Sequence, residues 1–189
     1  MRVRIVYILA IACITGCAPY NHHFYDIDIP GRELSNRCGI PESSLFSYQG
    51  LYIRIEVNAA HTPTNLGLTV YVPEGKDVKF LSDSVSIQEP LKSPPLEKLH
   101  HLRPRDESST GLHDSTSTMK GKSVVRKSIF GDVTHHMPYR FDLQPAFVAH
   151  EENGAITLPS MEIDKVRYPP VVIPYRAASK FVFASLNGC

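Results

Sequence analysis

Alternation of apolar and polar residues along much of the chain predicts a series of short β-strands. The clearest run is Leu51 to Val57, where leucine, isoleucine and valine alternate with tyrosine, arginine and glutamate. Leu66 to Val72 repeats the pattern after a turn-like segment that contains proline. A period of two puts successive side chains on opposite faces, as expected of a half-buried strand. The two runs therefore predict an antiparallel pair.

Further strands are expected along the rest of the chain, with Gly, Pro, Asn and Asp between them. Residues 168–174 contain three prolines and are expected to be an extended edge segment, because proline cannot donate to a ladder. Residues 180–186 are apolar on both faces and are expected to be central. The other expected strands are 78–81, 84–89, 124–125, 129–130, 139–143, 147–149, 155–158 and 161–166, the last with a tight turn at Asp164-Lys165.

This pattern predicts a mainly β chain. The spacing of strands and turns favours an antiparallel β-sandwich, immunoglobulin-like or jelly-roll-like, of about seven to nine strands. Residues 38–189 are expected to form one β-rich domain, interrupted by a flexible insertion at about 90–122 that is rich in Pro, Ser and Thr. Within the insertion, Leu96, Leu99 and Arg103 have the spacing of one or two helical turns.

The N-terminal segment has a different composition. Arg2 and Arg4 precede an apolar run from Ile5 to Ile14, the layout of a secretory signal peptide. The sequence Ile14-Thr15-Gly16-Cys17 resembles the lipobox of bacterial lipoproteins. Residues 1–16 are then expected to be a signal peptide and residues 17–37 a lipidated tether, part of which packs on the domain because it carries several apolar residues.

The resemblance implies that Cys17 is acylated with palmitate-type chains and inserted in the bilayer as a lipid anchor. Ala18 in place of aspartate implies sorting to the cell outer membrane, facing the periplasm or the exterior. Two readings compete with this one: a single transmembrane anchor, for which the run is short of the roughly 20 residues required, and plain secretion with Cys17 as a free thiol.

Two cysteines remain after the lipobox. Cys38 and Cys189 are expected to pair as a disulfide, because two thiols in an oxidising compartment usually do. The bridge would close a loop of about 150 residues and contribute on the order of 4 to 5 kcal/mol. The alternative is two unpaired thiols.

Histidines and basic residues are the remaining candidates for binding. His22-His23, His100-His101 and His135-His136 are adjacent pairs expected in turns or loops, where imidazoles could converge on a metal ion. Adjacent residues on a strand point apart, so His100, His101, His135 and His136 are weak candidates and no metal or other cofactor is predicted. Lys120, Lys122, Arg126 and Lys127 could meet an anionic partner, although solvated loop charges are the simpler reading.

The sequence predicts a non-catalytic lipoprotein that binds another envelope protein or a cell-wall component. The formal charge of +1 excludes a strong field for nucleic acid. Matches to a phosphate-binding loop, a zinc-protease helix and a nucleophile elbow are incomplete or missing, so no enzyme is predicted. The alternative function is a periplasmic metal or small-ligand binding protein that uses the loop histidines.

Overall fold

The computed structural model describes residues 19–37, 40–58, 65–89, 96–105, 112, 114–126, 133–145 and 153–183. These residues form antiparallel strands and turns, and none of them is helical. A large, nearly closed sheet and a smaller second sheet give a sandwich-like arrangement. The predicted mainly β, antiparallel fold class is therefore confirmed.

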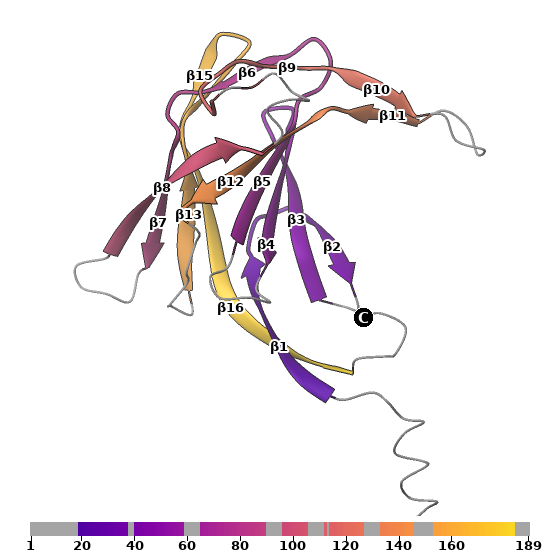
Figure 1. The fold of residues 1–189 in the computed structure, drawn as a ribbon, viewed down its shortest axis with the longest axis vertical. Helices are drawn as coiled ribbons and strands as arrows, with labels where there is room; N and C mark the ends of the chain where they lie inside the picture. The colour runs from indigo at the N-terminus through magenta and orange to yellow at the C-terminus, as the bar shows by residue number, and fades with distance from the viewer. Residues whose placement is uncertain are drawn as a thin grey trace, which may run out of the picture.

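Ten strands form the large sheet, called the curled sheet below. Its order is β1-β16-β13-β7-β8-β12-β5-β4-β3-β2. Strand β1 also contacts β3 and β4, so the two edges of the sheet come near each other (Figure 1). The strands are β1 Pro19–Ile27, β2 Glu33–Arg37, β3 Ile40–Tyr48, β4 Leu51–Asn58, β5 Asn65–Tyr71, β7 Ser84–Glu89, β8 Leu96–Pro104, β12 Pro138–Gln144, β13 Asn153–Leu158 and β16 Val171–Phe183.

The second sheet has four strands in the order β15-β14-β6-β9 and is called the small sheet. Its strands are β6 Asp77–Phe80, β9 Met119–Lys120, β14 Met161–Ile163 and β15 Val166–Tyr168. In Figure 1 it lies at the upper end of the curled sheet. Strands β10 Ser123–Arg126 and β11 Val133–His136 form a separate two-stranded ribbon that projects sideways from this end.

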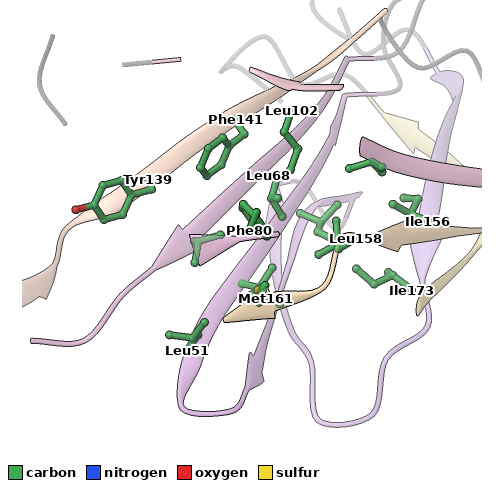
Figure 2. Close-up of a cluster of buried hydrophobic side chains, with 14 of the residues drawn as sticks. Leu51, Leu68, Phe80, Leu102, Tyr139, Phe141, Ile156, Leu158, Met161 and Ile173 are labelled. Atoms are coloured by element: carbon green, nitrogen blue, oxygen red, sulfur yellow. The ribbon is translucent and has the colours of Figure 1, made fainter. Parts of the chain in front are cut away.

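One apolar core joins the two sheets. Phe80 of the small sheet and Phe141 of the curled sheet are both fully buried, with ring centroids 5.5 Å apart in an edge-to-face arrangement. Figure 2 shows Leu68, Leu158 and Met161 gathered around them. Burying aromatic and aliphatic side chains of this size contributes about 1.5 to 3 kcal/mol each. The small sheet is therefore held to the curled sheet by shared core packing.

The alternation found in the sequence matches the burial in the structure. On β4 the residues Leu51, Ile53 and Ile55 are buried, while Tyr52 is exposed. Strands β5, β6, β7, β12 and β13 likewise confirm their predicted segments. The tight turn is confirmed as well: Asp164 and Lys165 have φ of 50° and 69° between β14 and β15. Positive φ at both central residues is typical of the two-residue hairpin turn that suits strand twist.

The helical prediction within the insertion was wrong. Residues 96–104 form strand β8, which pairs with β7 on one side and β12 on the other. Leu99, one of the three residues that suggested a helical face, is 62% exposed, whereas His100 and Leu102 are buried. The leucine spacing was thus a coincidence, because hydrogen bonding to two neighbouring strands outweighs a short helical propensity.

The extended edge predicted for the proline-rich segment is confirmed for residues 171–174. They open β16 and pair with β13 on one side, whereas β1 pairs with β16 only from Tyr175 onward. Pro174 is accommodated because the β1 ladder ends at the pair Ile27 and Tyr175, just before it. Beyond that point the Asp28 amide donates to the Pro174 carbonyl at 3.0 Å, a contact that needs no amide from proline.

Strands also occupy parts of the stretches assigned to the tether and the insertion. Strands β1 and β2 both lie within residues 17–37. In the curled sheet, β1 pairs with β16 and β2 pairs with β3. Strands β8 and β9 lie within residues 90–122. The segments 129–130, 147–149 and 184–186, for which strands were predicted, fall outside the described residues.

Candidate functional site

The cysteines that carry the lipid-anchor and disulfide predictions lie outside the described residues. This applies to Cys17, Cys38 and Cys189. Acylation at Cys17 and the bridge between the other two therefore stay predictions. Across the described ranges, no helix is long and apolar enough to cross a bilayer.

The adjacent histidines lie on strands, so their predicted placement in loops was wrong. His22 and His23 belong to β1, His100 and His101 to β8, and His135 and His136 to β11. Each of these segments is hydrogen-bonded to at least one neighbouring strand. Polar composition suggested loops, but backbone pairing decides the local structure here.

The histidine pair on β8 points to two different environments. His100 is buried, and its Nδ1 lies 2.7 Å from the Pro145 carbonyl oxygen. Because a carbonyl only accepts, Nδ1 carries the proton in this contact. His101 is exposed, with Nδ1 3.1 Å from Oδ2 of Asp83. The two imidazoles face opposite sides of the sheet and do not converge.

The pair on β11 is divided in the same way. His135 is exposed, whereas the ring of His136 is half-buried and stacks on Tyr52 of β4, with centroids 6.3 Å apart and planes 13° apart. Among the described residues, no group of three or more His, Cys, Asp or Glu side chains is placed to hold a metal ion. His100, His101 and His136 thus have separate contacts: a backbone carbonyl, a carboxylate and a tyrosine ring.

The predicted basic cluster is only partly described. Lys120 ends β9 and Lys122 follows it, both with exposed side chains, while Arg126 ends β10 and Lys127 lies outside the described residues. The Tyr139 hydroxyl donates to the Lys120 carbonyl at 2.7 Å and accepts from its amide at 3.1 Å. Burial raises the pKa of Tyr139, so the hydroxyl stays protonated and keeps the base of the ribbon in place.

A second set of charged residues, which the sequence reasoning missed, lies on the outer surface of the curled sheet. We call it the arginine face. It comprises the four arginines and two carboxylates that point away from the core on β4, β8 and β12 or directly after β8: Arg54, Glu56, Arg103, Arg105, Arg140 and Asp142. Strand register brings them together. Arg54 and Arg140 flank Thr69 of β5, and the next row contains Glu56, Gly67, Asp142 and Arg103.

Side chains of the arginine face cover Gly67 and Thr69, the small outward-facing residues of β5. Arg105 Nε lies 3.1 Å from both carboxylate oxygens of Asp142, and its Nη2 also donates to Oδ1. This Nη2 lies 3.4 Å from the position of a Cβ built on Gly67, so the guanidinium passes directly over the glycine. Thr69 is buried although it points outward. A Cβ at position 67 would already be in van der Waals contact with the guanidinium, so a side chain larger than alanine would press on this ion pair.

Aromatic rings adjoin the arginine face on the same surface. Tyr52 and Tyr71 are cross-strand partners and lie one row beyond Arg54 and Thr69. Tyr52 is 46% exposed while His136 stacks on its ring. Two buried polar atoms here, Nε of Arg54 and Nδ1 of His136, have no hydrogen-bond partner within the described part of the chain. Cations, aromatic rings and these polar atoms thus share one surface.

An ion cluster joins β1 to β16. Asp26 accepts from Arg32 at 2.9 Å and from Arg176 at 3.0 and 3.2 Å. Burial opposes ionisation of Asp26 and is the largest single influence, but hydrogen bonds and charge from the two arginines together outweigh it and lower its pKa below 3.8. The carboxylate is therefore charged at neutral pH and ties the first strand to the last.

These groupings depend on pairings that a single sequence does not reveal. Arg54 and Arg140 lie on strands distant in sequence, and Asp26 is 150 residues from Arg176. The usable signal was the alternation on β4, which already places Tyr52, Arg54 and Glu56 on one outward face.

No protein-family model matches the chain, and comparison with curated proteins and with solved structures gives no match either.

Proposed function

We propose that the chain is a lipoprotein of the bacterial cell envelope, anchored through acylated Cys17, and that its β domain is a non-catalytic binding or accessory module. The lipobox-like sequence Ile14-Thr15-Gly16-Cys17 supports the anchor, and Ala18 supports placement at the outer membrane, facing the periplasm or the exterior. Its partners are the bilayer and one further envelope component.

The start of β1 is the observation that carries this proposal. Pro19 is the first residue of β1, so only Ala18 separates it from Cys17. Two residues reach at most about 7 Å when fully extended. An acylated Cys17 therefore holds the first residue of the curled sheet at the level of the lipid head groups. The chain would then stand directly on the membrane, without a long spacer.

The direction of the strands supports an orientation in which the end of the fold opposite to Cys17 faces away from the membrane. Strand β1 starts at the membrane end and β16 runs antiparallel to it, so β16 starts at the far end. Strands β14 and β15 of the small sheet immediately precede β16 and lie at that far end (Figure 1). The arginine face lies on the side of the curled sheet. Both surfaces are then presented to molecules in the envelope space.

The distribution of polar groups favours a surface-binding role. The space between the two sheets is occupied by buried apolar side chains such as Phe80, Phe141 and Met161. The charged groups of the arginine face are displayed on the outside instead. Recognition by the outer surface is therefore better supported than chemistry in the interior.

The anchor is tested by membrane fractionation and mass spectrometry of the N-terminal peptide. We expect wild-type protein in the membrane fraction, with a diacylglyceryl mass on Cys17. A Cys17→Ala form should lose this mass and its lipid attachment, whereas Cys13→Ala, within the apolar run, should keep both. An unmodified Cys17 in membrane-extracted wild-type protein would refute the proposal.

The binding role is tested by crosslinking in cells, followed by mass spectrometry of co-purifying molecules. A reproducible envelope component that is lost in the Cys17→Ala form would support an anchored binding module. Turnover of a substrate by the purified protein would contradict the non-catalytic assignment.

A further inference from the structure

We infer that the arginine face, together with Tyr52 and Tyr71, binds an anionic glycan polymer, in which sugar rings carry carboxylate or phosphate groups. This inference names the partner chemistry of the binding role proposed above and rests on it. Nothing in the enclosed core takes part, because all the residues concerned lie on the outer surface of strands β4, β5, β8 and β12 or directly after β8.

Charge complementarity is the first argument. The arginine face contains four guanidinium groups and two carboxylates, so it carries net positive charge on a chain whose overall formal charge is only +1. Arg105 is held by Asp142, while Arg54 approaches Glu56 only to 3.9 Å. The planar fork of arginine matches carboxylate and phosphate groups with two parallel hydrogen bonds, which a solvated lysine does not offer.

The arrangement of the cations favours a polymer over a single small anion. Arg54 and Arg140 lie on either side of Thr69, in one row across three strands. Arg103 belongs to the next row, opposite Asp142. Side chains two positions apart on a strand are separated by about 7 Å. Such spacing presents several cations to repeated anionic groups along a chain.

Aromatic rings next to the cations point to sugar. Tyr52 is 46% exposed and forms a cross-strand pair with Tyr71 in the row beside Arg54. Tyrosine presents a flat apolar ring and a polar hydroxyl, which suits a ligand with both C–H faces and hydroxyl groups. His136 braces the Tyr52 ring by stacking on it. The aromatic group is thus held in a fixed orientation beside the charges.

Two polar atoms on this surface add an independent argument. Nε of Arg54 and Nδ1 of His136 are buried, and neither is hydrogen-bonded to any part of the chain that the structure describes. A buried polar atom without a partner costs about 1 to 3 kcal/mol. Arg54 lies two residues from Tyr52 on β4 and His136 stacks on the Tyr52 ring, so a hydroxyl-rich ligand at Tyr52 would bring donors and acceptors beside both side chains.

The test measures binding of full-length protein in detergent to polygalacturonate, with neutral dextran as the matched uncharged polymer. We expect retention on polygalacturonate that weakens steeply as salt is raised, and none on dextran. An Arg54→Gln, Arg140→Gln double variant should lower the affinity about tenfold or more. Tyr52→Ala should lower it without changing the salt dependence.

The control is Arg167→Gln, which removes the same charge from the exposed strand β15, away from the arginine face. Its affinity should equal that of wild type. Should the double variant fail to fold, Arg103→Gln replaces it, since this exposed side chain is changed without affecting the core. An equal loss in Arg167→Gln, or full binding by every arginine-face variant, would overturn the inference.

Vesicles containing phosphatidylglycerol, mixed without detergent with the Cys17→Ala form so that no lipid anchor contributes, separate a glycan from a lipid source of anions. Binding to these vesicles without binding to polygalacturonate would also overturn the inference. Neither result depends on Cys17, so failure of the glycan inference leaves the anchor intact, and failure of acylation leaves the glycan measurement unaffected.

Discussion

Replacing Asp26 with asparagine tests whether the ion cluster holds the first strand of the curled sheet. The Asp26 side chain is 12% exposed and that of Arg32 is 20% exposed, so their contact is largely shielded from water. Arg176 is 66% exposed, and its contact is screened. A shielded hydrogen bond between charged groups contributes about 1.5 to 3 kcal/mol and an exposed pair about 0.2 to 1 kcal/mol.

We therefore expect Asp26→Asn to lower the free energy of unfolding by about 2 to 3 kcal/mol at neutral pH. The effect includes the cost of leaving the guanidinium of Arg32, which is 20% exposed, without the counter-ion that its Nη2 contacts. Urea denaturation followed by circular dichroism measures it. Asp28→Asn, an exposed neighbour, is the control and should change stability by less than about 0.5 kcal/mol.

The pH dependence gives the sharper test. The pKa of Asp26 is lowered in the folded state, so its stabilising contribution is present above 3.8 and is lost as pH falls through the lowered value. The difference in stability between wild type and Asp26→Asn should accordingly shrink in acid. A difference that is the same in neutral and strongly acidic solution, or no difference at neutral pH, would refute the reasoning.

Three further substitutions test local geometry by thermal or urea unfolding. A Cβ at Gly121 would lie 1.8 Å from the Pro73 carbonyl oxygen, so Gly121→Ala should destabilise by about 3 kcal/mol or more. Lys165→Gly should stabilise by about 1 kcal/mol, because φ of 69° is unfavourable for any residue with a side chain. Tyr139→Phe removes the hydroxyl that bonds both backbone groups of Lys120 and should cost about 1 to 3 kcal/mol.

Each of these expectations has an outcome that contradicts it. Wild-type stability in Gly121→Ala would contradict a steric conflict between position 121 and the Pro73 carbonyl. A destabilised Lys165→Gly would mean that the lysine side chain matters more than its backbone conformation. If Tyr139→Phe unfolds like wild type, water replaces the hydroxyl at the base of the ribbon.

Local pattern was sufficient where one face of a strand is buried and the other is wet. Strands β4 and β12 are predicted from alternation alone, because their inward residues join the core and outward ones such as Tyr52 and Arg140 are exposed. On β8 the inward residues include His100, a polar side chain whose partner is the distant Pro145 carbonyl. A hydrophobicity pattern does not anticipate that contact, and the spacing of Leu96, Leu99 and Arg103 predicts helical turns instead.

The pairing of strands that are distant in sequence was not predictable for a different reason. Residues 19–27 carry enough apolar side chains to suggest packing, but their place beside β16 depends on a partner at the other end of the fold. Arg54 and Arg140 lie in one row because both are paired with Thr69 of β5, the strand between β4 and β12. Strand register and sheet order determine which distant residues come together, and neither can be predicted from one sequence without aligned relatives.

The pairing of β1 with β16 also affects the order in which the protein assembles. A chain is synthesised from its N-terminus, so Pro19–Ile27 emerges long before Tyr175–Phe183, with which it pairs. Contacts so distant in sequence form late, since a long loop must close first. The strand nearest the proposed anchor is thus the last to find its neighbour. A chain cut before Val171 would leave β1 and β13 with open edges, ready to pair with other molecules.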